Sequence, residues 1–325
     1  MATTAVAARD TNQPWTHRLT DVSFWAEWAA AVGLVLLVIV FQIRNPTFLS
    51  SGNIASMLVA AAILIILAVG QTFVVATGGI DLSVASVMTF GAVVFGSTYS
   101  HHWGLIWSCL AAIVAGGLAG LINGVLIARG KITDFIVTLG MLSAASGAAL
   151  ILADGKPVTI IDTFLLKLST GGIGVFGWTV IIAAVVAVVA HGVLFWTRFG
   201  THVLATGGSA EAATATGIST GRVKIAVYTI AGLLAGLGAI LLVARIGAAE
   251  PAANTSFLLN SVAAVVLGGV SLLGGRGTIV GPVIGALLLT ALTNGLTLLG
   301  VSQFYQPLAV GFVVVLAALL TRFQK

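Results

Sequence analysis

The chain has 325 residues, of which 59% are hydrophobic and 7% charged, and its mean hydropathy is +1.15. Soluble domains carry about 25% charged residues, so this composition excludes a soluble protein and predicts an all-α integral membrane protein. The 40 glycines indicate helices that pack closely through small faces. The formal net charge is +5, but the basic residues are scattered over short loops, which argues against a nucleic-acid partner.

Residues 1–25 are polar, lack the apolar core of a signal peptide, and are expected to form a cytoplasmic N-terminal tail. Residues 26–325 are expected to form a single transmembrane domain. Cys109 is the sole cysteine and lies in an apolar run, which excludes intrachain disulfides and cysteine-based metal sites. No metal-ligand spacing or nucleophile–base pattern stands out, so no metal, cofactor or catalytic centre is expected. A triad can still assemble from residues far apart in sequence.

Apolar runs long enough to cross about 30 Å of hydrocarbon predict about ten transmembrane helices. Several junctions are short and marked only by glycine, so counts between about six and eleven fit the pattern. The predicted spans are Glu27–Ile43, Met57–Thr77, Leu82–Tyr99, Leu105–Ala128, Thr133–Leu152, Val175–Trp196, Val223–Ala244, Leu258–Leu273, Ile279–Leu299 and Tyr305–Leu320.

The distribution of Lys and Arg orients these spans. With ten spans and a cytoplasmic N-terminus, only four of the 14 basic residues fall outside, namely Arg44, Lys156, Lys167 and Arg245. The inner set is Arg9, Arg18, Arg129, Lys131, Arg198, Arg222, Lys224, Arg276, Arg322 and Lys325. Because basic residues favour the cytoplasmic side, both termini and residues 197–222 are expected there.

A short internal similarity links Ala119–Leu126 to Thr290–Thr297, with Asn123 matching Asn294. The two segments lie five spans apart and would run in opposite directions, which predicts an inverted 5+5 repeat of the kind found in transporters. A match of eight small and apolar residues also arises by chance.

A polar segment, Thr197 to Arg222, interrupts the hydrophobic sequence. Ser209 is suited to cap a short helix over Ala210–Thr216, and Gly217 is suited to end it. Such a helix fits a groove in a partner protein. An ordinary loop containing one helical turn explains the pattern equally well.

Asp81, in the sequence Gly78-Gly79-Ile80-Asp81-Leu82-Ser83, is the sole carboxylate between Ile54 and Tyr99. The paired glycines allow the backbone to turn, and Asp81 or Ser83 can cap the next helix. This capping role is favoured over contact with a solute or ion, although a carboxylate at membrane depth is costly and often functional.

Other polar groups within the spans are candidates to line a path for a hydroxylated solute. They include Gln71, Asn123 and Asn294. Hydrogen bonding between helices is the more common role of such residues.

A second glycine-rich turn contains Gly274, Gly275, Arg276 and Gly277. It is interpreted as a structural turn, with Arg276 as an anchor at the cytoplasmic side. No phosphate-binding loop of the pattern G-x-x-x-x-G-K-[ST] occurs in the sequence, so the chain is not expected to bind ATP in such a loop.

Three of these segments, Gly78–Ser86, Ala205–Ile218 and Leu267–Gly281, resemble permease subunits of bacterial ribose/xylose-type sugar ABC importers. Asn45–Asn53 resembles the segment before the second span of that family. The resemblance covers the chain from about Asn45 to its C-terminus. Two departures, Ala85 and Ser209 where the family commonly has Gly and Asn, leave the sugar unspecified.

This resemblance implies a fold like the type II ABC importers in the bacterial cytoplasmic (inner) membrane. It also implies a second permease copy, cytoplasmic ATPase subunits that bind ATP and Mg²⁺, and a periplasmic or surface sugar-binding protein. The segment Ala205–Ile218 would be the coupling helix that docks on the ATPase. The coupling residues would be Gly207, Gly208, Ser209, Ala210, Glu211, Ala212, Ala213 and Gly217.

The expected function is therefore a non-enzymatic translocation subunit for a monosaccharide. A stand-alone secondary transporter or channel is the alternative, but it needs a coupling-ion site or pore ring. Asp81 and His191 alone are too few ionisable groups to form such a site or ring. A membrane enzyme has no residue pattern in its favour.

Overall fold

The computed structural model describes residues 22–252 and 255–321. The expected tail lies outside this part of the chain apart from residues 22–25, and so do Arg9, Arg18, Arg322 and Lys325 of the charge distribution. Thirteen helices and four two-residue strands make up the described residues.

The helices in chain order are α2 (Val22–Arg44), α3 (Ser51–Ala76), α4 (Val84–Ser100), α5 (Leu105–Ala128), α6 (Asp134–Leu152), α7 (Thr163–Thr170), α8 (Trp178–Trp196), α9 (Arg198–Gly208), α10 (Ala210–Ala215), α11 (Thr220–Ile246), α12 (Thr255–Leu267), α13 (Val280–Leu298) and α14 (Gln306–Thr321). The strands pair antiparallel, β1 (Val158–Thr159) with β4 (Ala248–Ala249) and β2 (Gly172–Ile173) with β3 (Phe176–Gly177).

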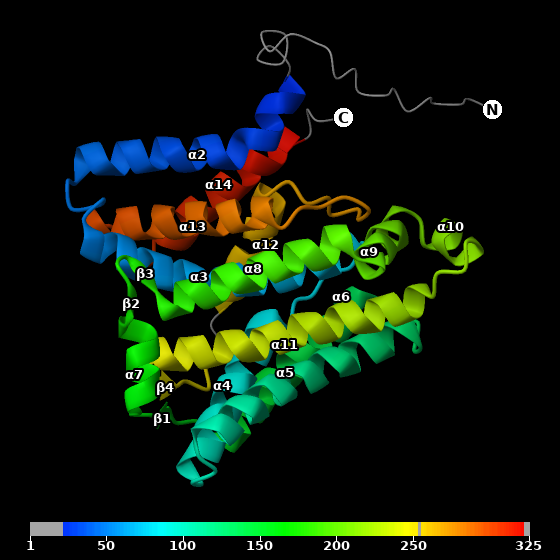
Figure 1. Ribbon diagram of the computed structural model, residues 1–325, viewed down its shortest axis with the longest axis horizontal. Helices are drawn as coiled ribbons and strands as arrows, with labels where there is room; N and C mark the ends of the chain where they lie inside the picture. Colours follow the sequence, from blue (N-terminus) through cyan, green and yellow to red (C-terminus); the bar gives the residue numbers. More distant parts are fainter. Residues whose placement is uncertain (1–21, 253–254, 322–325) are drawn as a thin grey trace.

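Most long helices run lengthwise through the molecule (Figure 1). The short helices α9 and α10 lie at one end, and α7 with the four strands lies at the other. We call these the α10 end and the α7 end. Helices α2, α13 and α14 form one side of the bundle, and α5 and α11 form the opposite side.

Six helices, α3, α5, α6, α8, α11 and α13, are long and apolar enough to cross a membrane. Helices α2, α4, α12 and α14 contain shorter apolar stretches. Each predicted span overlaps one of these ten helices, although the four shorter stretches do not meet the span criterion.

Several boundaries and one helix differ from the sequence predictions. Helix α12 ends at Leu267 instead of Leu273, because Gly269 adopts φ +75° and turns the chain away. Helix α8 begins at Trp178 instead of Val175, because the preceding residues form the β2–β3 hairpin. Helix α9 was not predicted; the hydroxyl of Thr197 caps it by accepting from the Gly200 amide.

Helix α3 is the centre of the fold. Every residue from Ala61 to Ala76 is buried, and the helix contacts α8, α11, α12 and α13. An α-helix that is apolar on all sides is stable only when it is surrounded, which explains its central position.

The most extensive contact between two helices is that of α5 with α11. A Cβ atom at Gly116 would overlap the carbonyl oxygen of Gly232, and one at Gly236 would lie 2.6 Å from the carbonyl oxygen of Ala112. The two backbones are therefore in direct contact, the packing that small residues allow between membrane helices.

Candidate functional site

The three glycine-rich segments found in the sequence meet at the α10 end, where α3 stops. The amide of Gly275 donates a hydrogen bond of 3.0 Å to the carbonyl oxygen of Ala76. A Cβ atom at Gly274 would lie 2.6 Å from the Gly78 nitrogen and 2.8 Å from the Gly207 carbonyl oxygen. We call Ala76, Gly78, Gly207, Gly274 and Gly275 the glycine junction.

Two physical requirements explain the glycines. Gly78, Gly274 and Gly275 have φ of +75°, +83° and +76°, which side chains of other residues disfavour. Gly207 is helical, but its Cβ atom would overlap the Ala76 carbonyl oxygen. The neighbouring Gly208 has room, because its Cβ atom would approach only Gly275, at 4.0 Å.

The chain between α3 and α4 carries a buried polar cluster. The carboxylate of Asp81, which is 3% exposed, accepts hydrogen bonds from the Ser83 amide at 2.7 Å and the Ser83 hydroxyl at 2.6 Å. Asn123 of α5 donates to the Ser83 hydroxyl at 3.0 Å, and Gln71 of α3 donates to the Asp81 carbonyl oxygen at 2.6 Å. The structure thus brings together four predicted residues, which we call the Asp81 cluster.

The predicted capping of α4 by Asp81 or Ser83 is wrong, because no side chain in the described part of the chain bonds to an amide of the first turn of this helix. Ser83 occupies the N-cap position of α4, but its hydroxyl makes no capping bond; the Asp81 carboxylate accepts from the Ser83 amide instead. Within the described residues, the side-chain oxygens of Gln71 and Asn123 are buried without a hydrogen-bond donor. The cluster therefore keeps spare acceptor capacity, which buried water commonly fills.

Two residues without a predicted role hold this turn. Asp134, the first residue of α6, accepts from the Ile80 amide at 3.1 Å, and the hydroxyl of Tyr228 of α11 donates to the Ile80 carbonyl oxygen at 3.2 Å. A Cβ atom at Gly79 would lie 2.8 Å from that hydroxyl. The sequence offered one signal for each of these residues: Asp134 is a carboxylate at the start of an apolar run, and Tyr228 is a lone Tyr among small residues.

Asn294 does not join the Asp81 cluster. It exchanges two amide hydrogen bonds, of 2.9 and 3.0 Å, with Asn53 at the first turn of α3. This pair ties α13 to α3 at the α7 end, whereas Gln71 lies near the other end of α3. The geometry is that of a bond between helices and not of a shared path with Asn123.

The predicted short helix is present as α10. The Ser209 hydroxyl accepts from the Ala212 amide at 3.2 Å, and Gly217 ends the segment with φ +88°. Glu211 and Ala212 are exposed, whereas Ala213 is 4% exposed and packs within the chain. The candidate coupling residues therefore divide into an outward-facing set and an inward-facing set.

The loop that ends in the glycine junction also has an exposed face. The carbonyl oxygen of Arg276 accepts from the Ser271 amide at 3.2 Å, which closes the loop, while the Arg276 side chain is exposed. Gly277 packs against Val270. Leu273 is 83% exposed, and it lies next to the glycines that contact α9.

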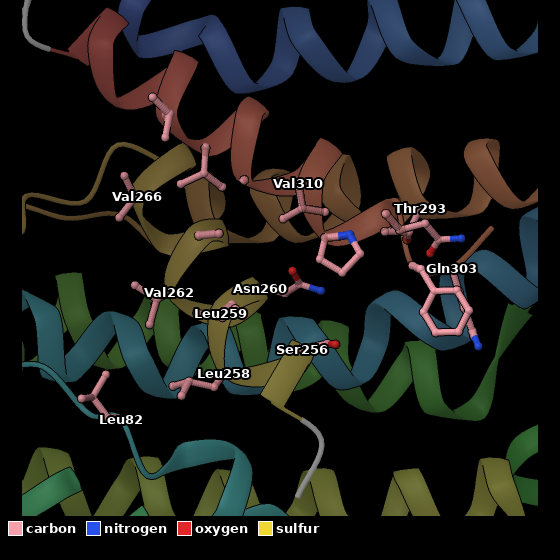
Figure 2. Close-up of a pocket in the computed structure, with 17 residues that line it drawn as sticks. Leu82, Ser256, Leu258, Leu259, Asn260, Val262, Val266, Thr293, Gln303 and Val310 are labelled. Carbon is pink, nitrogen blue, oxygen red and sulfur yellow. The ribbon is translucent and has the colours of Figure 1, made fainter. Parts of the chain in front are cut away.

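A groove of about 800 Å³ lies between α12 and α14. The labelled polar side chains of Ser256, Asn260, Thr293 and Gln303 gather toward one end of it, and apolar side chains occupy the other (Figure 2). The apolar end includes Leu82, the residue that follows Asp81. The groove therefore reaches the turn that the glycine junction holds.

The chemistry available in these places is hydrogen bonding. Among the described residues, no three His, Cys, Asp or Glu side chains come close enough to hold a metal ion. No Lys, Arg or His in this part of the chain pairs with the Asp81 carboxylate, and the groove lining contains no charged side chain.

Comparison with known proteins gives this arrangement its context. A family model described as "Branched-chain amino acid transport system / permease component" matches residues 53–320. The chain belongs to this permease family. The matched region contains the glycine junction, the Asp81 cluster and the groove.

Several curated relatives resemble this permease over most of their length. The ribose import permease RbsC of Bacillus subtilis is 40% identical over 296 residues, 90% of this chain and 91% of the relative. RbsC of Escherichia coli K12 is 37% identical, covering 90% and 92%. The L-arabinose permease AraH of Azospirillum brasilense is 36% identical, covering 90% and 88%. No solved structure matches the permease significantly.

These relatives confirm the resemblance on which the sequence prediction rested. Together with the six apolar helices, they establish that the permease is a multi-pass membrane protein.

Proposed function

We propose that this permease is the translocation subunit of an ATP-driven ABC importer for a monosaccharide such as ribose or another pentose. The observation that carries the proposal is the glycine junction, because it ties the exposed helix α10 to the buried Asp81 turn by backbone contacts. The relatives named for ribose and L-arabinose support a monosaccharide as the solute.

Residues 26–325 form one transmembrane domain of ten spans in this proposal: α2, α3, α4, α5, α6, α8, α11, α12, α13 and α14. The α10 end is cytoplasmic and the α7 end faces outward. The Lys and Arg residues support this orientation, since the connections near α10 carry Arg129, Lys131, Arg198, Arg222, Lys224 and Arg276. The membrane is the bacterial cytoplasmic membrane, and both termini lie inside.

An inverted 5+5 repeat is part of the proposal. It relates α3 to α11, α4 to α12 and α5 to α13. The helix contacts support it, because α5 packs on α11 as α13 packs on α3. Likewise α4 contacts α5 and α11, and α12 contacts α13 and α3.

Residues 197–222 form the coupling segment of the permease. Helix α10 docks in a groove of a cytoplasmic ATPase, and its exposed face of Ala210, Glu211 and Ala212 makes the contact. The ATPase binds ATP and Mg²⁺, and the permease itself performs no chemical step. Two conformations of the helix bundle that the ATPase binds unequally are enough to couple hydrolysis to transport.

The α7 end receives a sugar-binding protein, and a second permease copy completes the importer. Exposed apolar side chains at this end support a protein contact there, since a loop exposed to water rarely gathers so many. They are Ile161, Phe164, Ile173 and Phe176, exposed by 88%, 57%, 67% and 54%.

Purification with the partner ATPase tests the function. The permease, co-expressed with a candidate P-loop ATPase and placed in liposomes, should take up pentose only when ATP is supplied on the ATPase side. The sugar-loaded binding protein should stimulate ATP hydrolysis. Uptake without the ATPase, driven by an ion gradient, would establish the alternative of a secondary transporter.

A further inference from the structure

We propose that the groove between α12 and α14 is this chain's share of the sugar path, and that Leu82 closes its inner end. The inference rests on the proposed function and adds the location, the ligand chemistry and the gate.

The outer end of the groove offers hydrogen-bonding groups and an aromatic surface. The side chains of Asn260 and Gln303 make no hydrogen bond to other described residues, so both amides are available. Phe304, 83% exposed, lies beside them. Each amide offers donors and an acceptor, and an aromatic ring covers the apolar face of a sugar.

The two amides and the aromatic ring favour one kind of molecule in the groove over others. A lipid chain leaves the amides without partners, which costs free energy in an apolar environment. An ion calls for charged or converging ligands, and the lining has none. A hydroxylated, uncharged solute satisfies both the amides and the ring, and a volume of about 800 Å³ accommodates a monosaccharide with water.

The inner part of the groove has the opposite character. Val262 and Val266 line it near Leu82 (Figure 2) and offer no polar side-chain atom. A sugar that enters this part gains no hydrogen bonds from side chains, so it passes without being held. Apolar constrictions of this kind act as gates in membrane pores.

Leu82 stands where the valine-lined part meets the turn between α3 and α4 (Figure 2). Its neighbours are fixed on both sides: Asp81 bonds to Ser83, and Ile80 bonds to Asp134 and Tyr228. The Leu82 side chain therefore moves with the turn as a whole.

The turn is connected to α10 through the glycine junction. Gly274 lies between Gly78 of the turn and Gly207 of α9 and contacts the backbone of both. Helix α10 begins at Ala210, three residues after Gly207. A displacement of α10 by a partner can thus reach Leu82 without any flexible side chain between them.

Kinetics of sugar uptake test the groove. In liposomes with the ATPase and binding protein, Asn260→Ala, Gln303→Ala and Phe304→Ala should each raise the KM for uptake by about five- to tenfold, the loss of one neutral contact. Phe312→Ala, which removes an exposed aromatic ring of α14 that does not line the groove, should stay within about twofold. ATP hydrolysis without sugar should be unchanged in all four.

Leu82 is tested by leakage and by labelling. Leu82→Ala should admit pentose slowly without ATP, and Leu82→Trp should abolish uptake while the binding protein still stimulates hydrolysis. If either variant fails to assemble, Leu259→Cys, at an exposed position of the groove lining, provides the test in a Cys109→Ser background. A membrane-impermeant thiol reagent should modify it from outside, and ribose should slow the reaction.

Contrary outcomes separate this inference from the proposed function. ATP-dependent uptake with unchanged KM in all three groove variants would overturn the groove as a path and leave the importer intact. Modification of Leu259→Cys only by lipid-soluble reagents would make the groove a lipid contact.

Discussion

The amide of Gly275 and the carbonyl oxygen of Ala76 join two segments from opposite halves of the sequence with a hydrogen bond of 3.0 Å. The last carbonyl groups of a helix have no partner within it, so the end of α3 depends on this bond for one of them. The bond also holds the loop before α13 against α9, which contacts the same carbonyl oxygen through Gly207. A single backbone group therefore connects the central helix, the coupling segment and the second glycine-rich turn.

Gly207→Ala should disable transport, because its Cβ atom would overlap the Ala76 carbonyl oxygen and force α9 away from the junction. We expect at least about a tenfold loss of uptake, with the permease still present in the membrane. Gly208→Ala is the matched control, since its Cβ atom meets nothing closer than 4.0 Å. Equal activity of the two variants would show that the junction does not couple α10 to transport.

Ala212→Trp should separate the permease from its ATPase while leaving the fold intact, because Ala212 lies on the exposed face of α10. The expected result is normal membrane level, no uptake and loss of ATPase on purification. Ala213→Trp is different, because Ala213 is buried and overpacking costs about 1–3 kcal/mol of stability. Glu211→Gln should have little effect, since a charge near a helix N-terminus contributes about 0.3–1 kcal/mol.

The sidedness of the two ends is open to direct labelling. In a Cys109→Ser background, Ala212→Cys should react with an impermeant thiol reagent only from the cytoplasm, and Phe176→Cys only from outside. Both positions are exposed, whereas Thr206 within the same cytoplasmic segment is 3% exposed and unsuitable. Labelling of both cysteines from one side would overturn the ten-span topology.

Asp81→Asn should be mild. The amide oxygen can still accept from the Ser83 amide, and the new NH₂ group can donate to the unpaired oxygen of Gln71 or Asn123. Asp81→Leu leaves the Ser83 amide and hydroxyl without their acceptor, and each such loss costs about 1–3 kcal/mol. Thermal unfolding in detergent and uptake measure both variants. Complete loss of uptake in Asp81→Asn at a normal melting temperature would instead assign the charge a direct role.

The N-cap of α7 gives the α7 end a dependence on acid. Burial raises the pKa of Asp162, but hydrogen bonds from Tyr99, Leu165 and Phe164 outweigh it, and the pKa lies below its ordinary value of 3.8. A lowered pKa contributes stability that is present above the ordinary value and lost as the pH falls through the folded-state pKa. Tyr99→Phe should therefore reduce the drop in melting temperature between about pH 5 and about pH 3; an unchanged drop would contradict this origin.

The sequence predicted the helices well because a long apolar run has few other stable conformations in a membrane. Ser209, Ala210 and Gly217 likewise foretold α10, since capping and positive φ are local properties. Helix α9 escaped notice because its residues are polar and contain glycines, and it is stabilised by contacts with α3, α8 and α11. Packing of this kind leaves no local pattern.

The sequence could not predict which of the candidate residues lie close together in the folded chain. Each glycine pair suggested a turn, but nothing in the sequence says that Gly78, Gly207 and Gly274 touch one another. The same holds for Asn294, which as a polar residue within a span was a candidate to line a path, as was Asn123. Asn123 faces Ser83 and Asn294 faces Asn53, because the two segments lie at opposite ends of the bundle.

The seam between α5 and α11 limits how such a protein can move. Gly116 and Gly232 leave no side chain between the two backbones, so neither helix can rotate or slide without collision between main-chain atoms. The two helices therefore move as one rigid body. The change between inward-open and outward-open conformations must then come from movement of the other helices. Spin labels on α5 and α11 would keep a constant separation through the whole transport cycle.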